Sequence, residues 1–182
     1  MTLEELFKKT ITLLEKHESE YLIIGGIAAG ALGEPRVTGD IDVNIRIKKD
    51  LVKKFLMYAQ AEGFTYNSSE VNKRVKETGT FQIWCEDFHV DYLISSTKFE
   101  ENAFKRRQRI KLFGVAANFP TPEDLILFKV IPARPIDKID VENIVLRHKG
   151  RLDEKYLLDW AMKLSDEAQD VRIYKEVKRL LK

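Results

Sequence analysis

Residues 21–47, YLIIGGIAAGALGEPRVTGDIDVNIRI, contain several of the strongest structural signals in the chain. An apolar run stops at the pair Gly25-Gly26, and residues 28–32 are small and apolar, which is typical of a helix packed close to its neighbours. Over residues 41–47 apolar and polar side chains alternate, and this period of two predicts a strand with one solvated face. The segment therefore predicts a strand, a short helix and a second strand.

Two carboxylates stand at the start of the second strand. Side chains two residues apart share a face of a strand, so Asp40 and Asp42 project the same way. Adjacent carboxylates repel each other, and a divalent cation would remove that repulsion. Carboxylate oxygens suit Mg²⁺ or Mn²⁺, and Mg²⁺ is commonly held by one or two carboxylates together with substrate phosphates. The alternative is a pair of solvated acids at an exposed strand entry, with Arg36 or Arg46 as ion-pair partner.

A third carboxylate, Asp91, interrupts the apolar strand pattern of residues 89–94. If that strand lies beside the first, Asp40, Asp42 and Asp91 converge as the ligands of a two-metal centre, in which one ion binds a triphosphate and the other activates an attacking hydroxyl. Asp91 would then belong to the shell of only one metal. That position makes it the natural base-like residue beside the attacking group.

The glycine pair offers a place for phosphates. Gly25 and Gly26 permit a close approach of the backbone, and the helix that follows presents its N-terminal amides to negative charge. Arg36 and Thr38, just upstream of the acids, would add a guanidinium and a hydroxyl to the same phosphates. The alternative is that Arg36 and Thr38 only form the turn at the strand entry.

The rest of the chain alternates helices and strands and then becomes helical. Helices are expected at residues 3–17, 50–62 (capped by Asp50) and 98–109, strands at 80–84, 89–94, 110–113 and 115–117, and further β-rich pieces between 64 and 86. Thr121 and Pro122 begin a helix, and only helical patterns follow, with breaks at 132–135 and 149–150. We therefore expect an α+β fold with a core over residues 1–120 and a helical C-terminal subdomain over residues 121–182.

The strings GGIAAGALGEPRVTGDIDV (25–43) and HVDYL (89–93) resemble the nucleotidyltransferase superfamily typified by DNA polymerase β. More narrowly, R-x-T-x-D-I-D-V and the later P-x-E-D-L-I-x-x-K and R-P-x-D-x-x-D-x-x-N are similar to small prokaryotic members, which include the toxin-type, abortive-infection-like nucleotidyltransferases. The resemblance spans roughly residues 20–148. It implies a small mixed β-sheet flanked by helices and followed by a helical bundle.

The resemblance also implies roles for individual residues. It places Asp40, Asp42 and Asp91 in the catalytic, metal-binding positions, and it gives nucleotide-binding roles to Gly25, Gly26 and Lys129. The second glycine position is commonly serine in the superfamily, and glycine there is a variant that toxin-type members share. Because Lys129 lies among apolar residues of a helix, a solvated lysine is the alternative. Similarly, Asp137, Asp140 and Asn143 share one helix face, which is either a polar surface or part of a site.

Charge is nearly balanced over the whole chain, with 31 Lys and Arg against 29 Asp and Glu. A net charge of +2 gives no whole-chain argument for nucleic-acid binding, so any basic footprint must be local. The local cluster consists of Lys105, Arg106, Arg107, Arg109 and Lys111. It is either a solvated helix face or a surface that attracts a polyanionic acceptor such as RNA.

Several classes of site are excluded by composition. Cys85 is the only cysteine, so no intrachain disulfide forms, and the three histidines lack zinc-site spacing; we expect all four residues to be structural. No segment has the unbroken apolar length of a signal-peptide core or a membrane span. We therefore expect a cytoplasmic protein without membrane contact.

These features predict an enzyme that transfers a nucleoside monophosphate from a nucleoside triphosphate (NTP) to an unidentified hydroxyl or phosphate acceptor and releases pyrophosphate. A toxin-like enzyme would modify tRNA or a protein, and an antibiotic-modifying enzyme would modify an aminoglycoside or a lincosamide. The alternative is a non-catalytic nucleotide- or RNA-binding module, as part of a toxin–antitoxin pair. A third reading is a structural protein that assembles through its helical C-terminus. The acceptor, the preferred base and the oligomeric state stay open.

Overall fold

The computed structural model describes all 182 residues, in nine α-helices, one 3₁₀ turn and six strands. The helices are α1 (Leu3–Lys16), α2 (Gly25–Leu32), α3 (Val52–Ala61, after the 3₁₀ turn η1, Lys49–Leu51), α4 (Ser68–Glu77), α5 (Lys98–Arg106), α6 (Pro122–Val130), α7 (Pro135–Arg147), α8 (Glu154–Ala168) and α9 (Val171–Leu180). The strands are β1 (Glu20–Ile24), β2 (Asp40–Arg46), β3 (Thr80–Cys85), β4 (Phe88–Ile94), β5 (Gln108–Leu112) and β6 (Val115–Phe119). The predicted α+β fold is confirmed. None of the helices combines the length and the apolar character needed to span a membrane.

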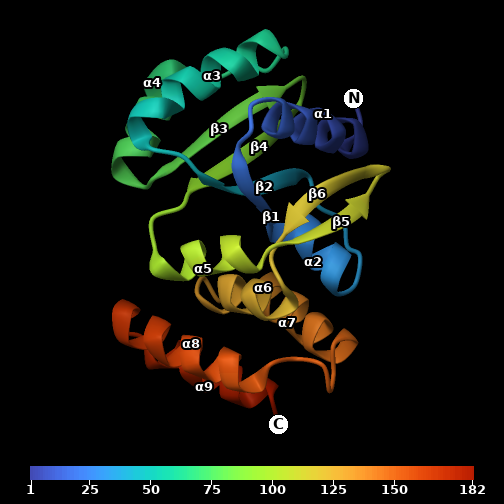
Figure 1. Cartoon of the computed structure of the whole chain (residues 1–182), viewed down its shortest axis with the longest axis vertical. Coiled ribbons are helices and arrows are strands. Elements are labelled where there is room, and N and C mark those ends of the chain that lie inside the picture. The colour runs from blue at the N-terminus through green and yellow to red at the C-terminus, as the bar shows by residue number, and fades with distance from the viewer.

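Four strands form a mixed sheet in the order β1-β2-β4-β3, and β5 and β6 form a separate hairpin that lies beside β1 (Figure 1). The central pair β2 and β4 is parallel, whereas β1 and β3 run antiparallel to their neighbours. In this register Asp42 lies between Ile24 of β1 and Asp91 of β4, and Asp40 lies next to His89. The parallel pairing thus brings the two acidic segments side by side.

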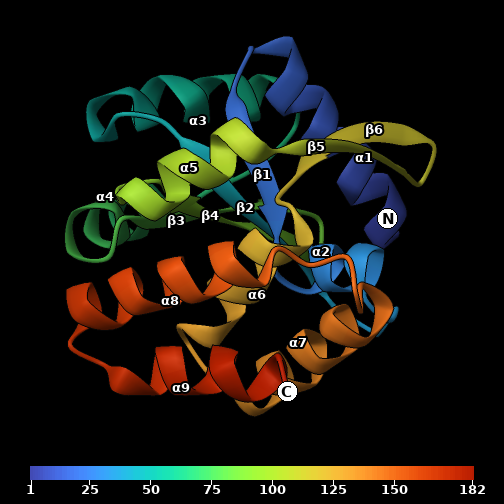
Figure 2. The ribbon, with the colours of Figure 1, turned by 60° about the horizontal axis from the view of Figure 1, so that its bottom comes forward.

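The sheet lies between two groups of helices. Helices α3 and α4 lie at one end of the long axis of the molecule, and the C-terminal helices lie at the other (Figure 1). Helices α8 and α9 run side by side and pack against α6 (Figure 2). A single hydrophobic cluster of 40 buried residues joins the sheet, the flanking helices and the C-terminal helices. Ile41, Val43 and Ile45 contribute the core face of β2.

The segment between residues 64 and 86 differs from the expectation of β-rich pieces, because it contains helix α4. Asn67 caps this helix by accepting a hydrogen bond from the Glu70 amide. Only Val71 and Val75 of α4 are buried, so the apolar stripe is too sparse to show a helical period in the sequence. Strand β3 was predicted correctly.

Three further expectations are corrected by the structure. Asp50 does not cap α3, because it lies in η1 and the helix begins at Val52 without a side-chain cap. The helix expected at 98–109 ends at Arg106, where β5 begins two residues later. The second face of β2 is not fully solvated, since Asn44 is 0% exposed and donates to Glu100 of α5 at 2.7 Å.

Candidate active site

The register of the sheet brings the acidic side chains together. One ligand atom each from Asp40, His89 and Asp91 lies within 4.8 Å of the other two, and all three side chains are half-buried. Asp42, the neighbour of Asp91 across the β2–β4 pair, adds a third carboxylate to this face of the sheet. We call Asp40, Asp42 and Asp91 the carboxylate group. Its negative charges lie close together, as the sequence predicted.

Asp42 is the most strongly perturbed acid of this group. Burial, together with the negative charges of Asp40 and Asp91, raises its pKa to about 6. A Cβ atom added to Gly25 would lie 1.7 Å from Oδ2 of Asp42, and Gly25 has φ +65°. Any other residue would therefore collide with the carboxylate as well as strain the backbone. Glycine at this position lets Asp42 lie directly against the first turn of α2.

Gly26 has a comparable role for the loop before β2. A Cβ atom there would lie 2.6 Å from Oγ1 of Thr38. The Thr38 hydroxyl donates to Oδ1 of Asp40 at 2.8 Å, so it orients that carboxylate. Arg36 donates through Nε and Nη2 to the two oxygens of Asp140, at 2.8 and 3.0 Å. Both side chains that were expected at the phosphates thus bind protein acids in the structure.

Lys129 lies in a network of ion pairs, and the alternative of a solvated lysine is wrong. It is 3% exposed, and Nζ donates to Asp140 at 2.7 Å and to Asp137 at 3.2 Å. Both acids are buried, so the alternative of a polar surface is also wrong for them. Arg134 binds Asp137 through Nε at 2.7 Å and through Nη2 at 3.1 Å. With Arg36, these four residues form what we call the ion cluster.

The charges of the ion cluster support one another. Burial acts to raise the pKa of Asp137, but hydrogen bonds and charge from Arg134 and Lys129 outweigh it, and the pKa is lowered. The pKa of Arg36 is raised, chiefly by its hydrogen bond to Asp140. Each of the three cations is paired with one or both of the two acids, and the cluster as a whole carries a net charge of +1.

A cavity of about 430 Å³ is lined by Asp42 of the carboxylate group and by Lys129, Arg134 and Asp137 of the ion cluster. The cationic side is supplied by Lys129 and Arg134, and the anionic side by Asp42 beside Gly25. Leu93 of β4 forms another wall, together with Ser96 and Thr97 of the connection to α5. The cavity therefore places one acid of the carboxylate group, Asp42, opposite two cations that suit an anionic ligand.

Residues 1–180 match the family described as "Nucleotidyltransferase of unknown function (DUF6036)". The chain belongs to this nucleotidyltransferase family. None of the curated proteins matches the sequence significantly.

Solved structures similar to this nucleotidyltransferase share its fold at low identity. The complex of ANT(2'')-Ia with adenylyl-2''-tobramycin is 15% identical with a TM-score of 0.57, over 98% of this chain and 99% of that one. The lincomycin-bound lincosamide antibiotic adenylyltransferase LnuA is 14% identical with a TM-score of 0.55, over 79% and 96%. An antigenic nucleotidyltransferase-like protein from Paracoccidioides brasiliensis is 15% identical with a TM-score of 0.55, over 97% and 92%.

Two residues of the candidate site were missed in the sequence. His89, expected to be structural, lies 3.3 Å from Asp91 through Nε2 and belongs to the same group of metal-capable side chains. Its position two residues before Asp91 on one strand was the available signal. Arg134 lines the cavity with a side chain that is 64% exposed. Its place directly before the first proline of α7 was the signal there.

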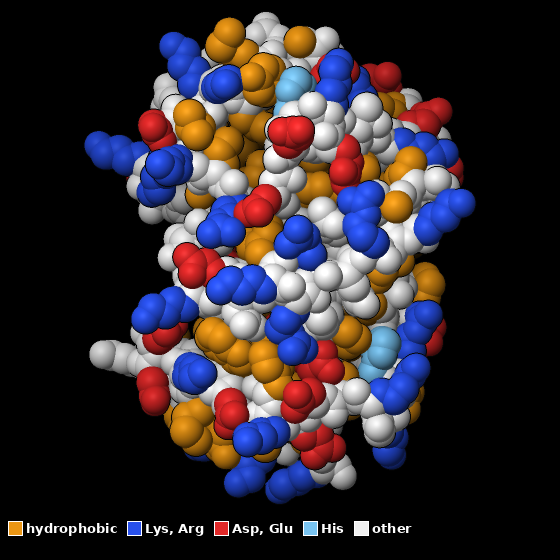
Figure 3. All heavy atoms as spheres, in the orientation of Figure 1, with side chains coloured by type: hydrophobic (Ala, Val, Ile, Leu, Met, Phe, Trp, Pro, Cys, Tyr) orange, Lys and Arg blue, Asp and Glu red, His pale blue; other side chains and the backbone are white.

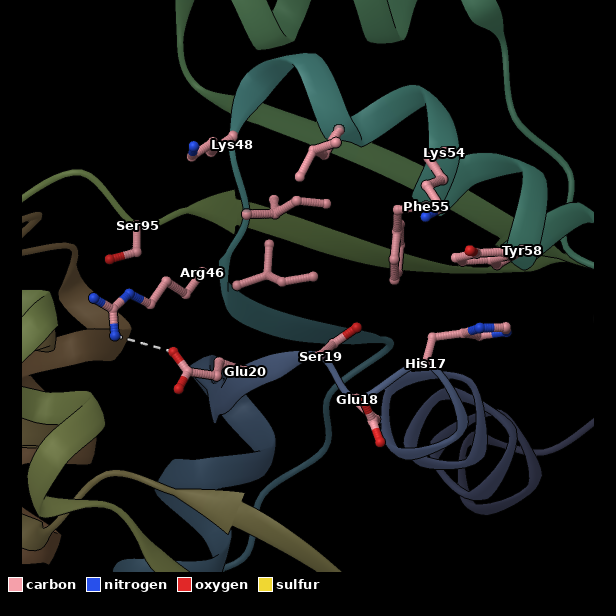
Figure 4. A pocket seen from close by; sticks show the side chains of 13 residues that line it. His17, Glu18, Ser19, Glu20, Arg46, Lys48, Lys54, Phe55, Tyr58 and Ser95 are labelled. Atoms are coloured by element: carbon pink, nitrogen blue, oxygen red, sulfur yellow. Dashed lines mark hydrogen bonds and ion pairs between the residues drawn. The ribbon is translucent and has the colours of Figure 1, made fainter.

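A hollow of about 640 Å³ lies at the opposite end of β2 (Figure 4). Figure 4 shows Arg46 paired with Glu20 at its edge, at 3.0 Å, and the stacked rings of His17 and Tyr58 on another side. Because β2 begins at Asp40 and ends at Arg46, the strand separates this hollow from the carboxylate group. The hollow is therefore distinct from the candidate active site.

The basic cluster around residue 106 is largely occupied by internal contacts. Arg106 donates to Asp124 at 3.2 Å, Arg107 to a backbone carbonyl at 2.7 Å, and Arg109 to Glu15 at 2.6 Å. The cluster is also divided between α5 and β5, so it does not form one helix face. Figure 3 shows one face of the molecule, on which Lys and Arg side chains are interspersed with Asp and Glu side chains.

Proposed function

We propose that this chain transfers a nucleoside monophosphate from an NTP to an acceptor oxygen and releases pyrophosphate. The observation that carries the proposal is the cavity that Asp42 and Gly25 share with Lys129 and Arg134. A triphosphate carries several negative charges, so it needs cationic side chains of the protein beside it. The divalent cation that it binds needs carboxylates as ligands. Both requirements meet in one space of suitable size.

The carboxylate group fits Mg²⁺ or Mn²⁺. Asp42 is half-buried beside Asp40 and Asp91, its pKa is raised by burial and by their charges, and its carboxylate accepts no hydrogen bond from the protein. A half-buried carboxylate without a donor is unfavourable unless a cation is supplied. We propose Asp40, Asp42 and Asp91 as the residues that hold the ion. Bound there, it would neutralise charge on the triphosphate and activate the attacking oxygen.

The protein groups around the cavity have separable roles in this proposal. Lys129 uses two of its three N–H donors on Asp137 and Asp140, which leaves one for a phosphate oxygen. Arg134 uses only two of its N–H donors on Asp137, one on Nε and one on Nη2, and its other donors are free for phosphate oxygens. The free amides at the start of α2, next to Gly25, lack a side-chain cap and suit a phosphate.

Asp91 is proposed as the base-like residue for the acceptor. The acceptor oxygen attacks the α-phosphorus, the bond from that phosphorus to the bridging oxygen breaks, and pyrophosphate leaves with that oxygen. The proton of the acceptor hydroxyl passes to Asp91. Gln82 donates to Oδ1 of Asp91 at 3.1 Å, which holds the carboxylate in one orientation for this transfer.

The acceptor could be a small antibiotic or a macromolecule. The similar structures of LnuA and ANT(2'')-Ia hold lincomycin and adenylylated tobramycin, which makes a hydroxyl-bearing antibiotic one candidate. A toxin-like role on tRNA or a protein is the other candidate. RNA contact through Lys105, Arg106, Arg107 and Arg109 has less support, because the three guanidinium groups bind within the protein. A non-catalytic module, the alternative function, would bind NTP without transfer.

Isothermal titration with Mg²⁺ and each non-hydrolysable NTP tests the proposal. The wild type and Asp159→Asn, an exposed acid on α8, should bind the nucleotide only with Mg²⁺ present. Asp40→Asn/Asp42→Asn should lose this binding. Binding that survives in the double variant would reject the carboxylate group as the metal site. Binding by the wild type without label transfer to any acceptor would favour the non-catalytic module.

A further inference from the structure

The face of the sheet that carries Asp91 continues onto the edge strand β3. The register places Gln82 beside Asp91 and Trp84 beside His89, so these four side chains project from one face. The Trp84 and His89 rings lie 4.8 Å apart at 43°. Trp84 is 39% exposed, so part of its indole ring is open to solvent. An aromatic surface thus lies next to the carboxylate group.

The backbone of Trp84 is held firmly although β3 is the edge of the sheet. Its amide donates to the Thr65 carbonyl at 2.7 Å, and its carbonyl accepts from the Thr65 amide at 2.8 Å. The backbone of the edge strand is therefore hydrogen-bonded at this residue, and this fixes the direction in which the Trp84 side chain leaves the strand. Arg74 of α4 adds a cation, with Nη2 at 3.6 Å from Oδ1 of Asp91 and Nε donating to Thr80.

The strand order divides the site into two sides. The groups suited to a triphosphate, Gly25, Lys129 and Arg134, line the cavity on the side of Asp42 and β1. Strand β4 carries Asp91 next to β2, and β3 lies beyond it. If the NTP occupies the cavity, an acceptor must reach Asp91 from the side of β3. The side chains on that side are therefore the ones that an acceptor meets.

We propose that Trp84, with His89, Gln82 and Arg74, forms the acceptor subsite, and that the acceptor is a nucleotide whose base stacks on Trp84 while a ribose hydroxyl meets Asp91. This inference rests on the proposed transferase function. An indole face binds planar π-systems, and stacking of a base on an aromatic side chain tolerates any base. The guanidinium of Arg74 suits a phosphate of the same nucleotide.

The charge of the subsite decides against one competing acceptor. Arg74 and His89 both lie beside Asp91, at 3.6 and 3.3 Å. The Arg74 cation would repel a polycationic aminoglycoside there. A site for such an acceptor would need additional carboxylates where Arg74 lies. A nucleotide, either free or at the end of an RNA strand, brings the negative charge and the planar ring that these residues match.

Fluorescence of Trp84 tests the inference directly. The chain has two tryptophans, so Trp160→Phe leaves Trp84 as the only one. This protein is first saturated with Mg²⁺ and a non-hydrolysable NTP, and that binding is followed by titration calorimetry. It is then titrated with AMP, with a short single-stranded RNA that has a free 3′ hydroxyl, and with an aminoglycoside. Saturable quenching by AMP indicates a free nucleotide as acceptor, and quenching by the RNA alone indicates a strand end.

A second variant keeps the test valid if Trp160→Phe does not fold. Trp84→Ala in the otherwise unchanged chain should weaken RNA binding, measured by fluorescence anisotropy, by about fivefold or more, because one stacked base is lost. Its binding of NTP with Mg²⁺ should equal that of the wild type. If NTP binds but Trp84→Ala binds RNA as the wild type does, or the aminoglycoside alone quenches Trp84, the acceptor subsite is rejected and the transferase proposal stands. If no NTP binds, both proposals fail.

Discussion

The carboxylate group and the ion cluster each contribute to the wall of one cavity, the first through Asp42 and the second through Lys129, Arg134 and Asp137, but their charges are arranged in opposite ways. Asp40, Asp42 and Asp91 are half-buried acids held close together on neighbouring strands, and the pKa of Asp42 is raised as a result. In the ion cluster each acid is buried and bound by two cations, and the pKa of Asp137 is lowered. Asp42 of the first region has no ion-pair partner, whereas each acid of the second region is paired with two cations.

This difference indicates which region serves binding and which serves stability. Removing an acid from the carboxylate group relieves repulsion in the ligand-free protein, so the fold should tolerate it while ligand binding is lost. Removing an acid from the ion cluster leaves a buried cation without its partner, so the fold should suffer first. We therefore expect substitutions of the carboxylate group to lower ligand binding without loss of stability, and substitutions of the ion cluster to lower stability first.

The largest expected effect is on stability, in Asp140→Ala. Lys129 and Arg36 both lose a partner, and Lys129 is buried. Breaking a buried ion pair by removing one partner destabilises a protein by about 3–5 kcal/mol. Urea denaturation at neutral pH measures the change, and Asp159→Ala on the surface of α8 should stay within about 0.5 kcal/mol of the wild type. Equal stability of the two variants would contradict a structural role for the ion cluster.

Asp42→Asn should show the reverse pattern. Nucleotidyl transfer should fall by about a hundredfold or more, equivalent to at least about 2.7 kcal/mol of transition-state stabilisation. The metal-free protein should be as stable as the wild type or more stable, because Asp40 and Asp91 no longer face a third negative charge. A label-transfer assay and thermal unfolding in the presence of a chelator measure the two effects. A marked loss of stability with normal transfer would break the contrast between the regions.

The acid dependence of stability sharpens the comparison further. The pKa of Asp137 is lowered from its ordinary value of 3.8, so the unfolded chain takes up a proton at a higher pH than the folded chain does. The stabilisation is complete above pH 3.8 and is lost as the pH falls through the folded-state pKa; each pKa unit corresponds to about 1.4 kcal/mol. Unfolding free energies below pH 5 should therefore change less steeply in Asp137→Asn. Identical slopes would show that Asp137 is not held in its charged form.

Local patterns in the sequence were sufficient for the strand–helix–strand segment, but Asp91 was placed beside Asp40 and Asp42 only on the condition that their two strands pair, as β2 and β4 do. The glycine pair and the two-residue period lie within residues 21–47, and the apolar run around Asp91 marks its strand. The ion cluster could not be predicted in this way, because Arg36 and Asp140 are separated by 104 residues. Lys129 looked solvated because its two acids belong to the next helix. His89 became part of the site only through the parallel register of β2 and β4.

The smallest effect expected is in Thr38→Val, which tests how the carboxylate group is oriented. Valine keeps the shape of threonine but removes the hydroxyl that donates to Asp40 at 2.8 Å. Groups that orient a metal ligand typically contribute a factor of about 10–100 in metal affinity, and we expect the lower end because Asp42 and Asp91 remain. Titration of Mg²⁺ in the presence of a non-hydrolysable NTP measures the loss, and Thr38→Ser should restore affinity. Wild-type affinity in Thr38→Val would mean that Asp40 is oriented by the sheet alone, and that the carboxylate group needs no support from the loop before β2.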